Sequence, residues 1–157
     1  MQIYASLHDR LKTQHLTIAE LIRNLPPQRI LVRPTPEKWN IHDTLAHLAQ
    51  YQITFINRVN QILHKDLPHF ERYKAEHDPD FEKFGKLDDQ DLFKSLYEQR
   101  TILNDLIFSL SKKDLERIGV HKKFGSLTII QWLEFFVLHE AHHIFTIFQL
   151  ANDTDIK

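Results

Sequence analysis

Near the C-terminal end, the stretch VLHEAHHIF, residues 137–145, places His139 and His143 four residues apart. In a helix this spacing puts two imidazoles one turn apart on one face, which suits two ligands of a single metal ion. The stretch also contains the pattern H-E-x-x-H, which is typical of the zinc-binding helix of a peptidase. The residues therefore pose a choice between a metalloprotease and a different kind of metal site.

The residues around this pair disfavour the peptidase. Zinc peptidases with this motif take their third ligand downstream of the pair, whereas the fourteen residues after His143 contain neither His nor Glu. A chain that is all-helical also offers no strand edge on which to lay a peptide substrate. We therefore expect the third ligand to come from upstream.

The upstream candidate is His47, within KWNIHDTLAHLAQY. It lies on the flank of a predicted apolar stripe, in line with Thr44 and Tyr51, so its side chain can point into the protein interior. His8 and His15, on an earlier helix, are further candidates, but a surface or boundary position is the favoured interpretation for both.

Chance is an alternative explanation of the pair, because the chain contains eleven histidines. Against chance, His139 and His143 share their helical face with Trp132 and Phe136, which predicts that this face is buried. A buried neutral imidazole must satisfy two ring nitrogens. A metal ion would bind one nitrogen and leave the other to donate to an acceptor nearby.

Two residues are weak catalytic candidates. Glu140 would be the general base in a peptidase, but it lies one residue and about 100° round the helix from His139. That position equally suits a side chain that faces solvent or a neighbouring helix. Tyr51 lies one turn beyond His47, where its hydroxyl would line a pocket or its ring would join the core.

Helical periodicity predicts four long helices and a short helical turn from Ser111. They run from about Ile3 to Leu25, from Asn40 to Leu63, from Asp88 to Leu110, and from Thr128 through Leu150. The expected N-terminal caps are Asn40, Asp88 and Thr128, the last in a capping box with Gln131, and the Pro26–Pro27 pair is expected to end the first helix.

These helices predict an all-α, four-helix bundle that forms a single domain over residues 1–157. The connection between the second and third helices, residues 64–87, is far longer than antiparallel neighbours need, which predicts a long crossover or a lid. For the aromatic residues on it, docking onto the bundle is favoured over ligand binding. They are Phe70, Tyr73, Phe81 and Phe84.

Composition excludes several classes. The formal charge is −1 and the basic residues are dispersed, so no nucleic-acid partner is expected. No cysteine is present, which excludes disulfides and thiolate ligands and requires any reacting thiol to come from outside. The N-terminal region becomes charged too early for a signal peptide, and the apolar region 129–150 is interrupted by polar residues. We expect a cytoplasmic protein with no membrane segment.

Two stretches together, RPTPEKWNIHDTLAHLAQY and GVHKKFGSLTIIQWLEFFVLHEAHHIF, resemble the DinB-like, YfiT-like superfamily of four-helix metal proteins. In that superfamily a Trp-led second helix carries one histidine and a later helix carries an H-x-x-x-H pair. The similarity covers nearly the whole chain, including the Pro-rich entry to the second helix and the FG-x-LT entry to the fourth.

The resemblance implies that His47, His139 and His143 are the three ligands of a divalent ion. Such a site leaves a coordination position open, which with zinc lowers the pKa of a bound water to about 7 or activates a thiol. Zinc and nickel are the favoured ions, with iron and manganese as alternatives. Relatives often carry Gln where this chain has Thr146, which puts any role of that amide in doubt. His142 is expected to pack or to hydrogen-bond outside the ligand set.

Three kinds of function follow from these features. The first is a metal-dependent enzyme acting on a small molecule, either a hydrolase or an S-transferase that uses a low-molecular-weight thiol as co-substrate, as the resemblance implies. The second is a metal-holding or stress-response module without turnover. The third is a helical interaction protein whose histidines are incidental. We favour the first, and the resemblance alone also suggests a homodimer.

Overall fold

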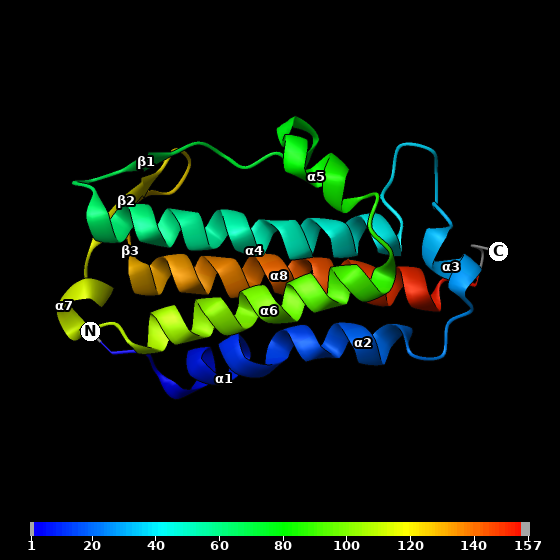
Figure 1. Cartoon of the computed structure of the whole chain (residues 1–157), viewed down its shortest axis with the longest axis horizontal. Helices are drawn as coiled ribbons and strands as arrows, with labels where there is room; N and C mark the ends of the chain where they lie inside the picture. The colour runs from blue at the N-terminus through cyan, green and yellow to red at the C-terminus, as the bar shows by residue number, and fades with distance from the viewer. Residues whose placement is uncertain (1, 155–157) are drawn as a thin grey trace.

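The computed structural model describes residues 2–154, which form a bundle of long helices lying side by side (Figure 1). In chain order the elements are α1 (Ala5–Thr13), the 3-10 helix η1 (Gln14–Leu16), α2 (Thr17–Ile22), α3 (Pro27–Leu31), α4 (Ile41–His64), β1 (His69–Phe70), the 3-10 helix η2 (Ala75–His77), α5 (Pro79–Phe84), α6 (Asp89–Phe108), α7 (Lys112–Leu115), β2 (Ile118–His121), β3 (Gly125–Thr128) and α8 (Ile129–Asn152).

The bundle consists of α4, α6, α8 and the broken rod made by α1, η1 and α2. Figure 1 shows that α4 and α6 run in the same direction, so the chain must return along the length of the bundle between them. The segment that returns, residues 65–88, passes over the outer side of α4, and we call it the strap. The predicted four-helix bundle with a long crossover between its second and third helices is confirmed.

Three of the long helices begin at the predicted N-terminal caps. Asn40 forms a capping box with Asp43 at the start of α4, and Thr128 forms one with Gln131 at the start of α8. Asp88 accepts a hydrogen bond from the backbone of the first turn of α6. Since each cap satisfies backbone N–H groups that a helix start leaves free, these residues fix where α4, α6 and α8 begin.

The first predicted helix is not continuous. It breaks at η1 and ends at Ile22, earlier than the Pro26–Pro27 pair, and Pro27 instead opens the short helix α3. Neither glycine nor proline occurs at the break. Its cause is tertiary: the carbonyl of Leu11, near the end of α1, accepts hydrogen bonds from side chains of Arg100 and Asn104 on α6.

A small three-stranded sheet was not predicted. Strand β2 pairs in parallel with β1 of the strap and antiparallel with β3, and so ties the strap to the hairpin that precedes α8. Gly119 is needed in β2 because a Cβ there would lie 2.7 Å from the Ile62 side chain. Gly125 adopts a φ of +74°, which favours glycine. The sheet also corrects the expectation that the chain has no strand edge.

The interior is divided along the bundle axis. One apolar cluster includes Leu7, Leu11, Phe55, Val59, Trp132 and Phe136. The other includes Ile18, Ile22, Leu45, Leu92, Leu96 and Ile147. Buried polar side chains lie on all four rods between them, namely His15, His47, Gln50, Gln52, Arg100 and Glu140. This polar layer contains the candidate site. Within the described residues, no helix is both long and apolar enough to cross a membrane.

Candidate metal centre

Three histidines from two helices converge at the polar layer. The Nε2 atom of His139 on α8 lies 3.2 Å from Nε2 of His47 on α4 and 3.2 Å from Nε2 of His143, one turn further along α8. Two nitrogens bound to one tetrahedral zinc ion are about 3.3 Å apart, because each Zn–N bond is about 2.0–2.1 Å long. The spacing therefore matches that of three ligands around one ion.

The three imidazoles are held neutral. Burial, with a contribution from neighbouring imidazoles, lowers the pKa of His47 to about 2, of His139 to about 3 and of His143 to about 4. At neutral pH each ring therefore keeps an unprotonated nitrogen. An unprotonated nitrogen is the form that binds a metal ion.

A shared cation suits this arrangement better than hydrogen bonds do. The Nε2 of His139 has one lone pair or one hydrogen, and it cannot make a good hydrogen bond to both of its neighbours. The opposite nitrogens, Nδ1 of His47 and Nδ1 of His139, are buried and have no hydrogen-bond partner among the described residues. The expected acceptors behind these two rings are therefore not found. The side on which the Nε2 atoms converge fits a metal ion.

Aromatic rings surround His47. The ring centroids of Trp39, Tyr51 and Tyr73 lie 5.1, 5.7 and 5.6 Å from that of His47, and Phe81 approaches it edge-on. Tyr73 and Phe81 belong to the strap, so its aromatic residues do dock onto the bundle as expected. Two of them also contact the histidine group.

Hydrogen bonds fasten the strap above the site. The amide of Gln50 on α4 donates to the carboxylate of Asp78 at 2.6 Å, and its carbonyl accepts from the hydroxyl of Tyr73 at 2.6 Å. Asp78 also caps α5, since it accepts from the backbone N–H of Asp80. The strap is therefore held over α4 at the level of His47, only three residues from Gln50.

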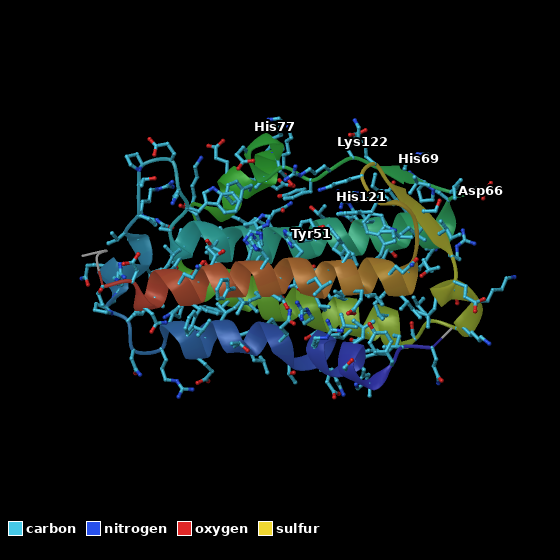
Figure 2. All side chains as sticks on the ribbon, turned by 180° about the vertical axis from the view of Figure 1, so that it is seen from behind. Tyr51, Asp66, His69, His77, His121 and Lys122 are labelled. Carbon is cyan, nitrogen blue, oxygen red and sulfur yellow. The ribbon has the colours of Figure 1, made fainter. Side chains whose placement is uncertain are left out.

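A cavity of about 780 Å³ adjoins the three histidines. Its walls come from α4, the strap, the β2–β3 hairpin and α8. In Figure 2, His77 of the strap and His121 of the hairpin lie above α4, the helix that carries Tyr51, and all three residues line the cavity. The lining residues are Trp39, His47, Tyr51, Arg72, Tyr73, Lys74, Ala75, Glu76, His77, His121, Lys123, Phe124, Phe135, His139, His142 and His143. The volume suits a small molecule.

Tyr51 lines this cavity and is almost fully buried. Its ring lies 4.3 Å from that of His139, centroid to centroid, and its hydroxyl oxygen accepts a hydrogen bond from Arg58 at 3.4 Å. Burial raises the pKa of Tyr51 to about 12, against the opposing effect of Arg58. The hydroxyl is therefore neutral at physiological pH and keeps its own hydrogen to donate.

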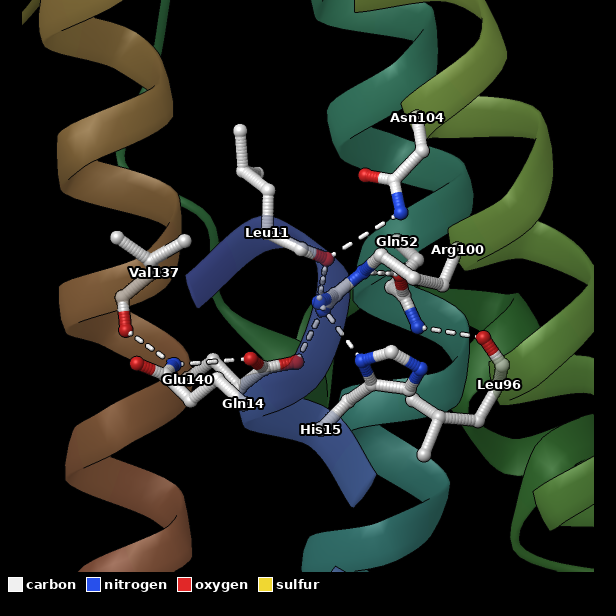
Figure 3. A network of polar contacts seen from close by, with 9 residues as sticks. All are labelled: Leu11, Gln14, His15, Gln52, Leu96, Arg100, Asn104, Val137 and Glu140. Atoms are coloured by element: carbon white, nitrogen blue, oxygen red, sulfur yellow. Dashed lines mark hydrogen bonds and ion pairs between the residues drawn. The ribbon is translucent and has the colours of Figure 1, made fainter. Parts of the chain in front are cut away.

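Glu140 faces away from the three histidines. Its carboxylate forms a buried ion pair with Arg100 on α6 and accepts from Gln14 at 2.9 Å (Figure 3). Arg100 also donates to Gln52 and contacts Nδ1 of His15 at 3.1 Å. Since its carboxylate is bound in this network, the structure assigns Glu140 a role in joining helices and gives no geometry for a base.

The remaining histidines lie outside the group. His15 is buried against Arg100, so the expected surface or boundary position is wrong for it, whereas His8 is half-buried beside Phe108. His142 is exposed and lines the cavity without joining the three nitrogens. The hydroxyl of Thr146 donates to the carbonyl of His142 and makes no contact with the site.

Several residues around the cavity were not singled out from the sequence. His121 is the clearest case: it lies between Gly119 and Gly125, and the alternating burial of β2 would have signalled an inward side chain had the segment been interpreted as a strand. Arg58, which donates a hydrogen bond to the cavity residue Tyr51, was also missed, because no sequence pattern distinguishes its buried guanidinium from those of the surface arginines.

Comparison with known proteins places the chain among relatives of the same architecture. YfiT from Bacillus subtilis, described as a probable metal-dependent hydrolase with an unusual four-helix bundle topology, superimposes with a TM-score of 0.80 at 17% identity, covering 99% of this chain and 92% of YfiT. The DinB-like protein YjoA from Bacillus subtilis gives a TM-score of 0.60 at 14% identity, covering 98% of this chain and 94% of its own.

Sequence comparison agrees with the structural one. The uncharacterised protein YuaE from Bacillus subtilis strain 168 is 26% identical over 136 residues, which cover 78% of this chain and 83% of YuaE. The family model described as the DinB superfamily matches residues 10–147, a span that includes all three converging histidines. The chain belongs to the DinB superfamily.

Proposed function

We propose that this protein binds one divalent metal ion through Nε2 of His47, His139 and His143 and uses it to act on a small molecule. The observation that carries the proposal is the convergence of three neutral imidazole nitrogens at 3.2 Å spacing beside a cavity of about 780 Å³. A structural metal site would be closed by a fourth protein ligand, whereas three histidines leave a position for substrate.

A divalent ion in this place supplies a Lewis acid that polarises a carbonyl or activates a water or thiol near neutral pH. The chain supplies the rest. His47 and His139 present their nitrogens from two helices whose caps fix their register, and the strap covers His47 with Tyr73. The hydroxyl of Tyr51, neutral and held by Arg58, is placed to donate a hydrogen bond within the cavity.

Hydrolysis and thiol transfer both suit such a site. The structural likeness to YfiT supports a hydrolase, because YfiT is described as a probable metal-dependent hydrolase. For thiol transfer the nucleophile would be a low-molecular-weight thiol, because the chain itself has no cysteine. Zinc or nickel is the ion we propose, since neutral imidazoles suit both, with iron or manganese as alternatives.

The test compares wild type with His143→Ala, each loaded with zinc, nickel, manganese or iron. Hydrolysis is followed with aryl esters and amides, and thiol transfer with small thiols and an electrophilic arene. Turnover that requires both metal and His143 supports the enzyme. The runner-up function, a metal-holding module, is supported instead by stoichiometric metal with no turnover in either assay.

We also propose that two copies of this chain pair through α8. Its outward face carries Leu138, Phe145 and Phe148, which are 59%, 57% and 46% exposed. Apolar side chains gathered on one exposed face are typical of interaction surfaces. Light scattering is expected to give twice the chain mass for wild type and the chain mass for Leu138→Glu. A monomeric wild type would contradict the pairing.

A further inference from the structure

His121 is a buried side chain in the cavity wall that the metal centre does not use. Its ring is 3% exposed and packs against Phe124, Trp132 and Phe135. Since the ring of Phe135 lies between those of His121 and His139, His121 occupies a separate part of the cavity.

The hairpin fixes which nitrogen of His121 carries the hydrogen. Its Nδ1 accepts hydrogen bonds from the backbone N–H groups of Lys123 and Phe124 at 3.0 and 3.2 Å. Nδ1 is therefore the acceptor, and the neutral ring must carry its hydrogen on Nε2. Burial, together with Arg58 and Lys123, lowers the pKa of His121, which keeps the ring neutral at pH 7.

Nε2–H of His121 is then a hydrogen-bond donor with no acceptor among residues 2–154. This nitrogen is not fully enclosed by the protein, so it opens onto space that a ligand can reach. Because the ring lines the cavity, that space is the cavity. A fixed, unpaired donor in a cavity wall calls for an acceptor from the ligand.

The charges around this donor are predominantly positive. Arg72 and Lys74 on the strap and Lys123 on the hairpin line the cavity, and within the described part of the chain none of them forms an ion pair. Glu76, an exposed strap residue, is the one acidic side chain among the lining residues. The rim therefore attracts anions.

The buried guanidinium of Arg58 adds a further positive charge, next to the cavity residue Tyr51. Arg58 is 8% exposed, and its guanidinium is held by the Tyr51 hydroxyl, the Glu71 carbonyl and the faces of two aromatic rings. It pairs with no carboxylate in the described chain. A buried charge without a counter-ion is costly, and an anion in the cavity would compensate it.

We propose that the part of the cavity beside His121 binds the anionic oxygen group, a carboxylate or a phosphate, of a small molecule whose apolar part lies against Phe124 and Phe135. Nε2–H of His121 and the ammonium of Lys123 hold the anion, and Arg58 stabilises it through Tyr51. The other end of the ligand then faces the three histidines. That this ligand is the substrate rests on the proposed function, whereas the binding site itself does not.

Metal-free protein provides the test, because a carboxylate would also bind a metal ion. Binding of 3-phenylpropionate, phenyl phosphate and the neutral 3-phenylpropanamide is measured by calorimetry at low salt. We expect at least one anion to bind about tenfold more tightly than the amide, the gain of one charge-assisted hydrogen bond. The preference should weaken as salt is added.

Three variants test which residues produce the preference for an anion over the amide. His121→Asn keeps an acceptor for the hairpin N–H groups and removes the Nε2 donor, and Lys123→Gln removes an exposed charge without disturbing the core. Both are expected to lose most of the preference. Lys122→Gln is the matched control, since Lys122 neighbours both residues but pairs with Glu71 outside the cavity.

Wild type that binds neither anion more tightly than the amide overturns the proposal. So does a preference that survives unchanged in both His121→Asn and Lys123→Gln. If His121→Asn fails to fold, Lys123→Gln decides the outcome alone. Metal content is measured separately, so failure of the metal site and failure of the anion site are told apart.

Discussion

His139 and Glu140 are consecutive on α8, yet their side chains meet different helices. Nε2 of His139 lies 3.2 Å from Nε2 of His47 on α4, whereas the carboxylate of Glu140 pairs with Arg100 on α6. Successive helical residues point about 100° apart, so one turn of α8 serves both contacts. The three converging histidines and the buried ion pair are thereby placed at the same level of the bundle.

Replacing Glu140 by Gln should destabilise the fold without removing the metal. The change leaves Arg100 buried and unpaired, and breaking a buried ion pair costs about 3–5 kcal/mol. Chemical denaturation measures the loss. Glu134→Gln is the control, because the Arg10–Glu134 pair is about one-third exposed and should cost no more than about 1 kcal/mol.

Metal content of the same variants then separates structure from chemistry. Glu140→Gln that folds and binds metal as wild type does would agree with a positioning role in the bundle. Folded Glu140→Gln that is as stable as wild type but has lost its metal would contradict the role assigned to the carboxylate.

His15 should make stability depend on pH. Burial and the adjacent Arg100 lower its pKa to about 3 from 6.5. Between these values the unfolded chain binds a proton that the folded chain does not, so stability is lost as pH falls from about 6.5 towards 3. In metal-free protein, urea unfolding at several pH values should show a smaller loss for His15→Asn, which keeps an acceptor for Arg100. Equal losses in both proteins would refute this role.

Gln50→Ala should loosen the strap while the bundle remains folded. The substitution leaves the Tyr73 hydroxyl and the Asp78 carboxylate without their shared partner. We expect amide hydrogens in residues 72–78 to exchange about tenfold faster, with α6 and α8 unchanged. Gln61→Ala, on the same helix near its end, is the control. Unchanged exchange over the strap would show that these bonds do not hold it.

Metal binding should stabilise the folded chain. An ion present at about one hundred times its dissociation constant raises the unfolding free energy by about 2.7 kcal/mol when it binds only the folded state. Thermal unfolding with and without zinc should therefore differ for wild type and not for His47→Ala. A shift of equal size in His47→Ala would mean that zinc binds elsewhere.

Much of the fold was predictable because its signals are local. The capping boxes at Asn40 and Thr128 and the cap at Asp88 are defined by residues three apart, so the starts of α4, α6 and α8 were correctly placed. The break at η1 was not predicted, because it depends on Arg100. This residue is distant in sequence and reaches the carbonyl of Leu11 only in the folded state. The short strands were also not predicted, because β2 pairs with β1, which is distant in sequence.

The histidine group was predictable for a different reason. His139 and His143 are paired by helix geometry alone, and His47 was reached through its place on an apolar stripe and through the family resemblance. His121 and Arg58 were not found, because what distinguishes them is an unpaired donor and an unpaired charge. Both properties depend on partners that only the folded chain reveals.

Metal content tests the central claim most directly. Wild type, His47→Ala, His139→Ala, His143→Ala and the control His142→Ala are purified without a polyhistidine tag, equilibrated with zinc or nickel, and analysed by elemental mass spectrometry, with circular dichroism to confirm the fold. We predict about one ion per chain in wild type and His142→Ala and none in the other three variants. Metal retained in folded His47→Ala at the wild-type level, or absent from wild type, would contradict the three-histidine centre.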